Sequence, residues 1–384
     1  MQRKKAHVRK RVFTALLFFF LILLGIGLFK LVKFLPVFWE LMVQKEVVLK
    51  ETKENRVNVL LLGVGGGDHE GPDLTDTVIF ASLDPKTKRV TLVSLPRDLW
   101  IPDIGAKVNA AYTFGEEKQK GGGLVLTKAV VGKVVGQQID YAIKIDFSGF
   151  EKAVDMVGGL DIDVDNTFDD YAYPIAGLEK EPCGFDDDKI ASLSAEIATG
   201  SATESDAFPC RYEHLHFDQG TMHMDGKTAL KYVRSRHALG PEGSDFARSK
   251  RQEKVINAFK DKIFSAGTLL NPGKVFRLLD VLEGSIEMDI KQEEFDDFVR
   301  LAQKLKGAKI NSAIIDIGDE ERSGLLVNPP ISDEYFKAWV LSPRIGNGEY
   351  REIQKYINCI IDGNECVVTG SGVTTITPTT ETKE

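Results

Sequence analysis

The chain has 384 residues, of which 28% are charged and 43% hydrophobic, and its formal net charge is −8. This length suffices for an apolar core, and the composition excludes a collagen, a largely disordered chain and a membrane protein with many spans. Residues 1–11 hold six basic and no acidic side chains. The remaining 43 basic and 57 acidic residues give −14, which argues against nucleic-acid binding through bulk charge. Any anionic ligand must therefore meet a local basic cluster.

An apolar segment follows this basic tip. Residues 12–29 contain no charged side chain, and apolar residues continue to position 39. This length predicts one membrane-spanning signal anchor over 12–37. The basic block places residues 1–11 in the cytoplasm and the rest of the chain outside the cell membrane. A cleaved signal peptide is the alternative, but the run is long and no A-x-A-like cleavage site follows it.

The four cysteines agree with an external location. An even number of cysteines outside the cytosol suggests two bridges, and because Cys183 and Cys210 flank one segment and Cys359 and Cys366 another, we expect these pairs. Four free thiols are the alternative. No cysteine–histidine spacing of a zinc site is present, so we expect no structural metal.

The chain beyond the anchor has an α/β pattern. A polar stalk is predicted over 38–56, a main domain over 57–320 with an irregular insertion at 166–212, a C-terminal part of that domain over 321–366, and a disordered Thr-rich tail over 367–384. Short apolar or β-rich runs predict strands at 57–62, 77–83, 89–95 and 141–145, of which 77–83 and 89–95 form a hairpin. Helices are predicted at 124–135, 150–157 and 245–265.

Two segments that resemble known ligand loops fail their templates. The glycine-rich segment 63–67 follows a strand, but it lacks the spacing of a P-loop or of a dinucleotide-binding turn, and we interpret it as a tight active-site turn. Asp161, Asp163 and Asp165 lack the glycine and glutamate of a calcium loop. They alternate with apolar residues, which predicts the solvent-facing side of a strand.

Several arginines occupy unusual positions. Arg234 and Arg236 are two residues apart, so in an extended segment they would share a face. On a helical wheel of 245–265, four polar side chains lie on or beside the apolar face: Asp245, Arg248, Arg251 and Gln252. Buried guanidinium groups need anionic partners. The residues alone leave two alternatives open, a structural ion-pair network or a pocket for a phosphate-bearing ligand.

A carboxylate and a guanidinium meet at the ends of the predicted hairpin. Pairing 77–83 with 89–95 brings Asp76 and Arg97 to neighbouring strand ends. Carboxylates beside a phosphate site usually hold Mg²⁺, which offsets their repulsion of the ligand. A plain Asp–Arg salt bridge is the alternative interpretation.

Four ordered blocks resemble the LytR–CpsA–Psr family of bacterial cell-envelope proteins. They are DLTDTVIFASLDPKTKRVTLVSLPRDLWIP at 73–102, KVNAAYTFG at 107–115, IDFSGFEKAVDMVGGLDIDV at 145–164, and MDGKTALKYVRSRH with SDFARSKRQEKV between 224 and 255. The resemblance covers about 200 residues. It implies a single mixed-sheet α/β domain outside the membrane, with a long apolar pocket for a polyprenyl chain.

The resemblance also implies a reaction and its residues. The family transfers a glycopolymer, with its phosphate, from a polyprenyl diphosphate carrier to a peptidoglycan sugar hydroxyl, with Mg²⁺ as cofactor. The diphosphate would be bound by Arg97, Arg234, Arg236, Arg248 and Arg251. Asp76 would hold Mg²⁺, Asp98 or Asp245 would orient arginines or assist deprotonation, and Lys107 and Gln252 would lie near the head group. Phosphoryl transfer needs positioning and charge neutralisation more than covalent help.

The sequence departs from the family pattern in two places. Leu74 stands where the family commonly has arginine, so one guanidinium is missing. The second metal-binding carboxylate is either Asp68 or Asp73, because the usual acid after the first strand is replaced by the glycine-rich turn. Two alternative functions therefore stay open: a non-catalytic lipid-binding or regulatory protein, and a diphosphate hydrolase that uses water as acceptor.

Overall fold

The computed structural model describes residues 49–50, 56–67, 71–264, 281–319 and 322–376. The predicted cytoplasmic tip, the membrane anchor and most of the stalk lie outside the described residues. No helix in the described ranges is both long and apolar enough to cross a membrane. The described residues divide into two compact units, one within Lys50–Asp289 and Leu305–Glu384 and the other formed by Leu49 with Ile290–Lys304.

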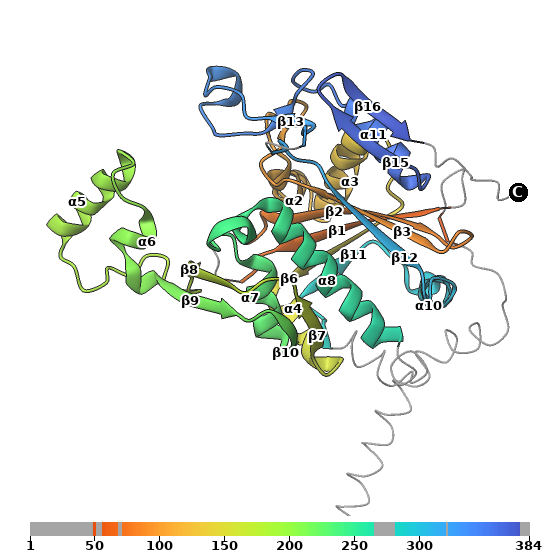
Figure 1. Ribbon diagram of the computed structural model, residues 1–384, viewed down its shortest axis with the longest axis horizontal. Helices are drawn as coiled ribbons and strands as arrows, with labels where there is room; N and C mark the ends of the chain where they lie inside the picture. The colour runs from red at the N-terminus through yellow and green to blue at the C-terminus, as the bar shows by residue number, and fades with distance from the viewer. Residues whose placement is uncertain (1–48, 51–55, 68–70, 265–280, 320–321, 377–384) are drawn as a thin grey trace, which may run out of the picture. The chain divides into compact units, whose positions relative to one another are not determined.

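A six-stranded mixed sheet forms the centre of the larger unit (Figure 1). Its spatial order is β11-β6-β1-β2-β3-β12. The strands are β1 (Val57–Val64), β2 (Thr75–Asp84), β3 (Arg89–Leu95), β6 (Tyr141–Asp146), β11 (Ile286–Met288) and β12 (Lys309–Ile314). β1 runs parallel to β6 and β12 parallel to β3, whereas the other neighbours are antiparallel. The predicted mixed-sheet α/β class is confirmed.

The β2–β3 hairpin has the predicted register. Asp84 faces Arg89 at the turn, and Val78 faces Leu95 at the far end. Asp84 also accepts hydrogen bonds from the backbone of Lys86 and Thr87, an Asx-type arrangement that closes the turn. The open end of the hairpin therefore presents the residues before β2 and after β3 side by side.

One apolar cluster packs helices against the sheet. α3 (Gly122–Val135) and α11 (Arg351–Ile361) present aliphatic side chains to alternate residues of the strands, with α2 (Ala111–Lys118) beside them. Members of this cluster that are almost completely buried include Leu60, Leu62, Phe80, Val93, Val131, Val134, Ile353 and Ile357. This alternation is the expected consequence of the two-residue period of a strand.

A second apolar cluster forms around three other helices and a small sheet. It joins α4 (Phe147–Met156), α7 (Gly226–Arg234) and α8 (Asp245–Phe264) to β7 (Leu160–Val164) and β10 (Gly220–Met224). Residues of β7 alternate between buried and exposed, which confirms that Asp161 and Asp163 lie on the solvent side of a strand, whereas Asp165 follows the strand and is partly buried. α8 also contacts β12, and α4 contacts β6.

The insertion at 166–212 was predicted to be irregular, and that prediction was wrong. β8 (Phe168–Pro174) pairs with β9 (Tyr212–Phe217), and the sequence between these two strands forms α5 (Asp187–Ala198) and α6 (Glu204–Ala207). The ribbon forms because Phe168, Leu215 and Phe217 are buried on one side of it. The aspartates and prolines of the segment favour irregular structure in a sequence-based prediction, and the alternation of apolar and polar residues along β8 and β9 is short.

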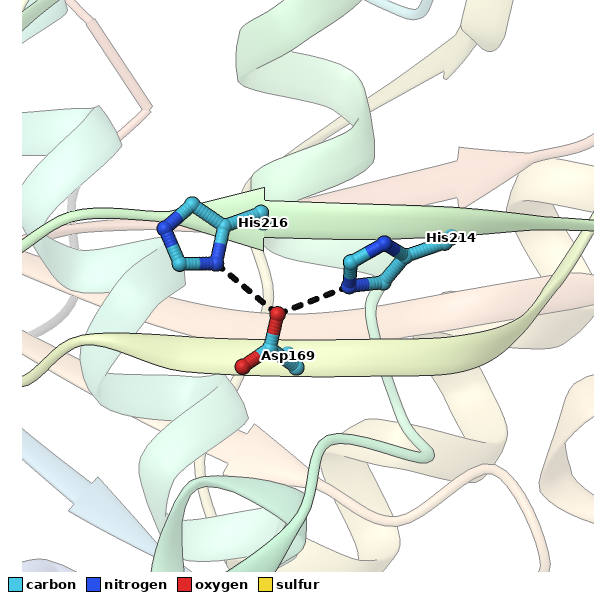
Figure 2. Close-up of side chains that lie close together, drawn as sticks. All are labelled: Asp169, His214 and His216. Atoms are coloured by element: carbon cyan, nitrogen blue, oxygen red, sulfur yellow. Dashed lines mark hydrogen bonds and ion pairs between the residues drawn. The ribbon is translucent and has the colours of Figure 1, made fainter.

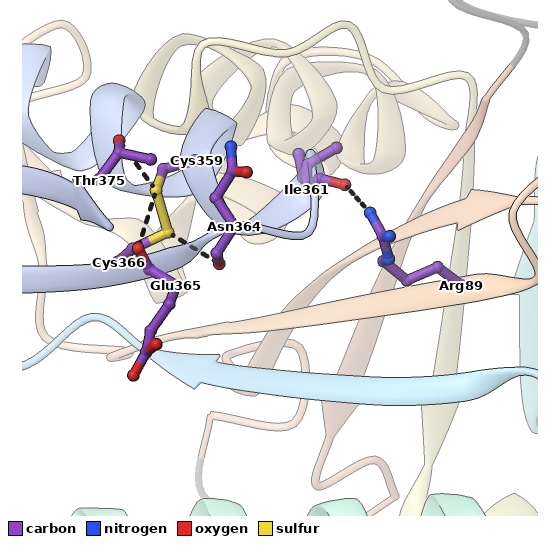
Figure 3. The surroundings of a disulfide bond; sticks show 7 residues. All are labelled: Arg89, Cys359, Ile361, Asn364, Glu365, Cys366 and Thr375. Atoms are coloured by element: carbon purple, nitrogen blue, oxygen red, sulfur yellow. Dashed lines mark hydrogen bonds between the residues drawn. A yellow bond between two sulfur atoms is a disulfide. The ribbon is translucent and has the colours of Figure 1, made fainter. Parts of the chain in front are cut away.

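The C-terminal tail also differs from its prediction. Residues up to 376 form a hairpin of β15 (Glu365–Thr369) and β16 (Gly372–Ile376), in place of a disordered tail. Val373 is buried and joins the main apolar cluster, which explains why this Thr-rich segment is ordered. The Cys359–Cys366 disulfide ties the end of α11 to β15 (Figure 3). Residues 377–384 lie outside the described part.

Short elements complete the fold. They are β4 (Trp100–Ile101), β5 (Ala106–Lys107), β13 (Leu326–Val327), β14 (Ser342–Pro343) and the 3-10 turns η1 (Val108–Ala110), η2 (Pro209–Arg211), η3 (Gly240–Gly243), η4 (Gln292–Glu294) and η5 (Asp333–Tyr335). In the smaller unit, α10 (Phe295–Lys304) carries a buried ion-pair set in which Arg300 lies 3.3 Å from Asp296 and 3.2 Å from Asp297.

Both predicted disulfides are present, Cys183–Cys210 across the insertion and Cys359–Cys366 near the C-terminus. The first closes a separation of 27 residues and the second one of 7. Loop-closure entropy therefore predicts a loss of about 3.5 kcal/mol for the double Cys183→Ala, Cys210→Ala variant and about 2.5 kcal/mol for the other pair. Denaturant unfolding of the two double variants checks the order, and a larger loss for the 359–366 pair would contradict it.

Candidate functional site

Two adjoining cavities open where β2 begins and β3 ends. Cavity 1 has a volume of about 420 Å³ and cavity 2 of about 250 Å³. Both are lined by the same four residues, Asp76, Thr77, Arg248 and Gln252. The apolar wall of cavity 1 consists of Val78, Leu95, Pro96, Ile314, Ile315, Ile317, Trp339 and Leu341. The polar residues shared by the two cavities and the apolar wall of cavity 1 together suit a ligand that has a charged end and an apolar end.

Asp76 and Arg97 lie together at the open end of the hairpin, as predicted, and they form the ion pair of the alternative interpretation. Arg97 Nη1 donates to Asp76 Oδ1 at 2.5 Å, and both side chains are about one-third exposed at 35% and 40%. Burial alone would lower the pKa of Arg97, but the hydrogen bond and charge of Asp76, together with Asp98, raise it above its ordinary value. Arg97 therefore stays a cation beside cavity 2.

Asp98 and Lys107 support this pair from outside the cavities. Lys107 Nζ donates to Asp98 Oδ1 at 2.6 Å, and Asp98 Oδ2 lies 3.6 Å from Arg97 Nε. Neither residue lines cavity 1 or cavity 2. In this arrangement Asp98 orients Arg97, and Lys107 holds Asp98.

Arg234 and Arg236 both line cavity 2. The extended segment predicted for these residues explains this shared position only in part. Arg234 is the last residue of α7, and the chain becomes extended only at Ser235. The backbone there is held by the fully buried Asp170, whose Oδ2 accepts from Ser235 Oγ at 2.7 Å and from the amides of Arg236 and His237 at 3.2 Å. A carboxylate with this many donors fixes the segment firmly.

Aromatic rings hold the Arg234 guanidinium. It lies 3.9 Å above the Phe147 ring, and Nη1 donates to Tyr173 Oη at 3.2 Å. Burial raises the pKa of Tyr173, partly opposed by the charge of Arg234, so this hydroxyl stays protonated. Such stacking orients a guanidinium without neutralising its charge.

α8 presents two side chains to the cavities and a third to the core. Arg248 and Gln252, one helical turn apart, line both cavities. Arg251 is 2% exposed and lines neither cavity. Its donors bond to Tyr232 O at 3.0 Å, to Ser235 O at 2.7 Å, and to both the backbone and the carboxylate of Glu242. Burial lowers its pKa, opposed by Glu242. The structural alternative therefore describes Arg251.

Three predicted acids lie elsewhere or cannot be described. Asp73 is half-exposed at 51%, lies 3.7 Å from Lys144 and lines neither cavity. Asp68 lies outside the described residues, and of Asp245 only its position as the first residue of α8 is described. The glycine-rich turn ends β1, with Gly66 and Gly67 at positive φ, but it does not reach the cavities.

The far wall of cavity 1 contains residues that the sequence did not reveal. Arg322 makes a bidentate pair with Asp316, at 3.0 and 2.5 Å, and Asp319 and the half-exposed Trp339 lie beside them. Asp316 raises the pKa of Arg322 by accepting a hydrogen bond, although burial opposes this. No spacing pattern marks these residues, because Asp316, Asp319 and Arg322 follow β12, which pairs in parallel with β3. Trp339 is placed by the separate pairing of Leu341 with Leu99.

Comparison with known proteins identifies the family of this chain. A model of the LytR_cpsA_psr family matches residues 40–331. The chain belongs to this family. A relative from Oceanobacillus iheyensis, named polyisoprenyl-teichoic acid–peptidoglycan teichoic acid transferase TagU, is 27% identical over 279 residues, which cover 71% of this chain and 70% of the relative. A Bacillus mycoides protein of the same name is 28% identical over 281 residues, covering 71% and 73%.

Solved structures agree with the fold of the LytR_cpsA_psr family. The crystal structure of Bacillus subtilis TagV matches with a TM-score of 0.51 at 23% identity, covering 81% of this chain and 99% of TagV. This likeness extends to the fold, and it supports the central mixed sheet. Leu74, the position of the expected departure from the family pattern, directly precedes β2 and is 36% exposed.

Proposed function

We propose that this LytR_cpsA_psr protein transfers a glycopolymer, with its phosphate, from a polyprenyl diphosphate carrier to a sugar hydroxyl of peptidoglycan. The observation that carries this proposal is the convergence of Arg97, Arg234, Arg236 and Arg248 on two adjoining cavities in an otherwise acidic protein. The names of the relatives, which are polyisoprenyl-teichoic acid–peptidoglycan teichoic acid transferases, support the same reaction.

The transfer breaks one phosphoanhydride bond and forms one phosphodiester. The acceptor hydroxyl oxygen attacks the phosphorus that carries the glycan, and the bridging oxygen leaves with the polyprenyl monophosphate. The hydroxyl proton passes to a carboxylate or to the leaving phosphate. Negative charge grows on the transferred phosphoryl and leaving oxygens, where guanidinium donors stabilise it.

The arginines differ in how they are fixed. Arg97 is held by Asp76 and Asp98, and Arg234 is held by two aromatic rings and the buried Asp170 behind its segment. Because these supports exist before ligand binds, little reorganisation is needed when charge develops. The apolar wall of cavity 1 would take the first isoprene units of the carrier.

Asp76 fits a Mg²⁺ ligand. It is the carboxylate that lines both cavities beside the arginines, and Mg²⁺ is usually held by one or two carboxylates together with substrate phosphates. Mg²⁺ would neutralise phosphate charge there. Asp73 fits less well in this conformation, because its carboxylate lies beside Lys144.

The membrane location is part of the proposal. The uncharged run at 12–29 and the basic residues before it support a single anchor with a cytoplasmic N-terminus. Two disulfides in the described chain support an oxidising, external location for the folded part.

The Asp76→Asn substitution tests the site. We expect transfer by the full chain in detergent to fall by about 100-fold or more, since the carboxylate both holds Arg97 and would bind Mg²⁺. Chelation of Mg²⁺ should abolish wild-type transfer. Asp103→Asn is the matched control, because this exposed acid pairs with Lys133 away from the cavities. Equal rates for Asp76→Asn and Asp103→Asn would contradict the assignment.

The missing family arginine allows the non-catalytic alternative to be tested. Leu74→Arg restores the family pattern at the start of β2. If the wild type binds polyprenyl phosphate without turnover while Leu74→Arg transfers polymer, the protein is a binding or regulatory member. If both transfer, position 74 is dispensable and the transferase proposal stands.

A further inference from the structure

The β8–β9 ribbon carries two histidines and an aspartate on one exposed side. His214 and His216 are two residues apart on β9, so they share a face, and Asp169 is the register partner of His216 on β8. On the opposite face Phe168, Leu215 and Phe217 are buried, which fixes the direction of the three polar side chains. Their spacing follows from the ladder itself rather than from a flexible loop.

Both imidazoles point to the same carboxylate oxygen (Figure 2). His214 Nε2 lies 2.7 Å and His216 Nδ1 lies 2.8 Å from Asp169 Oδ1. One ligand atom from each residue lies within 4.8 Å of the other two, and among the residues that the structure describes this is the one group of three or more with that property. Ligand atoms of tetrahedral zinc are about 3.3 Å apart. The two contacts of 2.7 and 2.8 Å would therefore lengthen by about 0.5 Å when the ion enters.

The surroundings hold both rings in place. His216 Nε2 lies 3.2 Å from Asp218 Oδ1, which is the carboxylate–histidine arrangement that orients zinc ligands. The Tyr171 ring stacks on His214 at a centroid distance of 4.1 Å and an interplanar angle of 4°. All three candidate ligands are partly exposed, with 30 to 47% of their side-chain surface accessible, so an ion can reach them.

We propose that Asp169, His214 and His216 bind one Zn²⁺ ion, with water completing a tetrahedral site. Two imidazoles and one carboxylate are ligands that zinc accepts, whereas Mg²⁺ prefers oxygen alone. The site is separate from the proposed phosphate site, since neither histidine lines cavity 1 or cavity 2. It uses no cysteine, so no cysteine–histidine spacing in the sequence marks it.

The ion would brace the segment that carries the arginines. β8 presents Asp169 to the proposed metal and, one residue later, the buried Asp170, which accepts from the Ser235 hydroxyl and from the amides of Arg236 and His237. The backbone carbonyl of Asp169 also accepts from the amide of Leu239 at 2.9 Å. A metal bridge between β8 and β9 therefore stiffens the strand on which the position of Arg236 depends.

Calorimetric titration of Zn²⁺ into the tag-free full chain tests the proposal, in detergent with excess Mg²⁺ after chelator treatment. We expect one Zn²⁺ per chain, a higher thermal midpoint with Zn²⁺, and at least about 10-fold weaker binding for His216→Ala and for Asp169→Asn. Substitution by Co²⁺ should give the visible absorption of a tetrahedral site.

His223→Ala is the matched control. His223 is also exposed and pairs with Asp161 at 2.7 Å on another ribbon, but no third ligand lies beside them among the residues that the structure describes. Its substitution should change Zn²⁺ affinity less than about 2-fold. The proposal is overturned if the chain does not bind Zn²⁺, or if His223→Ala weakens binding as much as His216→Ala does. Circular dichroism shows whether each variant is folded, and the exposed positions make folding defects unexpected.

Discussion

Replacement of Arg248 by alanine is expected to lower glycopolymer transfer by about 10²- to 10³-fold. Arg248 lies on α8 where both cavities meet, so its guanidinium can contact the diphosphate whichever cavity holds the leaving phosphate. The free energy of unfolding should change by less than about 1 kcal/mol, because the side chain is only partly buried. Initial rates of transfer and denaturant unfolding of the full chain measure the two effects. Arg234→Ala should show a loss of transfer of the same order.

Lys250→Ala is the control for charge on the same helix. Lys250 is 53% exposed, pairs with Asp165 at 3.2 Å, and lines neither cavity 1 nor cavity 2. Its loss removes the same unit of positive charge two residues away and should leave the rate within about 2-fold of wild type. Near wild-type transfer by Arg248→Ala, or equal losses in both variants, would show that no specific guanidinium contact is made there.

Arg251→Ala is expected to act on stability instead. It leaves the carbonyl oxygens of Tyr232 and Ser235 without a donor and the Glu242 carboxylate without its cation. Breaking a buried pair of this kind typically costs about 3–5 kcal/mol. The transfer rate should fall strongly at temperatures where the variant begins to unfold. At lower temperatures the loss of rate should be smaller. The shift of the denaturant midpoint measures the cost.

A compensated variant separates the structural role of Arg251 from ligand binding. Arg251→Met combined with Glu242→Gln removes both charges, so most of the lost stability should return. Transfer should then recover as well, because Arg251 does not line the cavities. If Arg251→Ala has the denaturant midpoint of the wild type yet loses transfer, the side chain acts on the ligand. The structural role assigned to Arg251 is then wrong.

The hairpin shows what the sequence could predict. Two β-rich runs joined by a five-residue turn specify an antiparallel register, and that register places Asp76 beside Arg97. The helical wheel likewise placed Arg248 and Gln252 on one side of 245–265, and both line the cavities. The periods of strand and helix and the residues of the turn are enough to predict where these side chains lie, because their neighbours are close in the sequence or on the same element.

Long-range pairing was the part that could not be predicted. A helical wheel gives the face on which Arg251 lies, but it does not show that Glu242 and two carbonyl groups meet it there. The wall formed by Asp316 and Arg322 depends on β12 joining β3 from more than 200 residues away, and Trp339 depends on the pairing of Leu341 with Leu99. The same limit hid the β8–β9 ribbon, whose strands are separated by two helices and a disulfide.

The central claim is that the glycan-linked phosphate moves together with the polymer. The most direct test is transfer by the full-length protein with Mg²⁺ from a carrier whose glycan-linked phosphate is labelled with ³²P. The account predicts that the label is recovered on peptidoglycan as a phosphodiester, in proportion to the polymer, and that Arg248→Ala prevents this. Label remaining on the lipid or appearing as phosphorylated glycan released into water, with none on peptidoglycan, would contradict it.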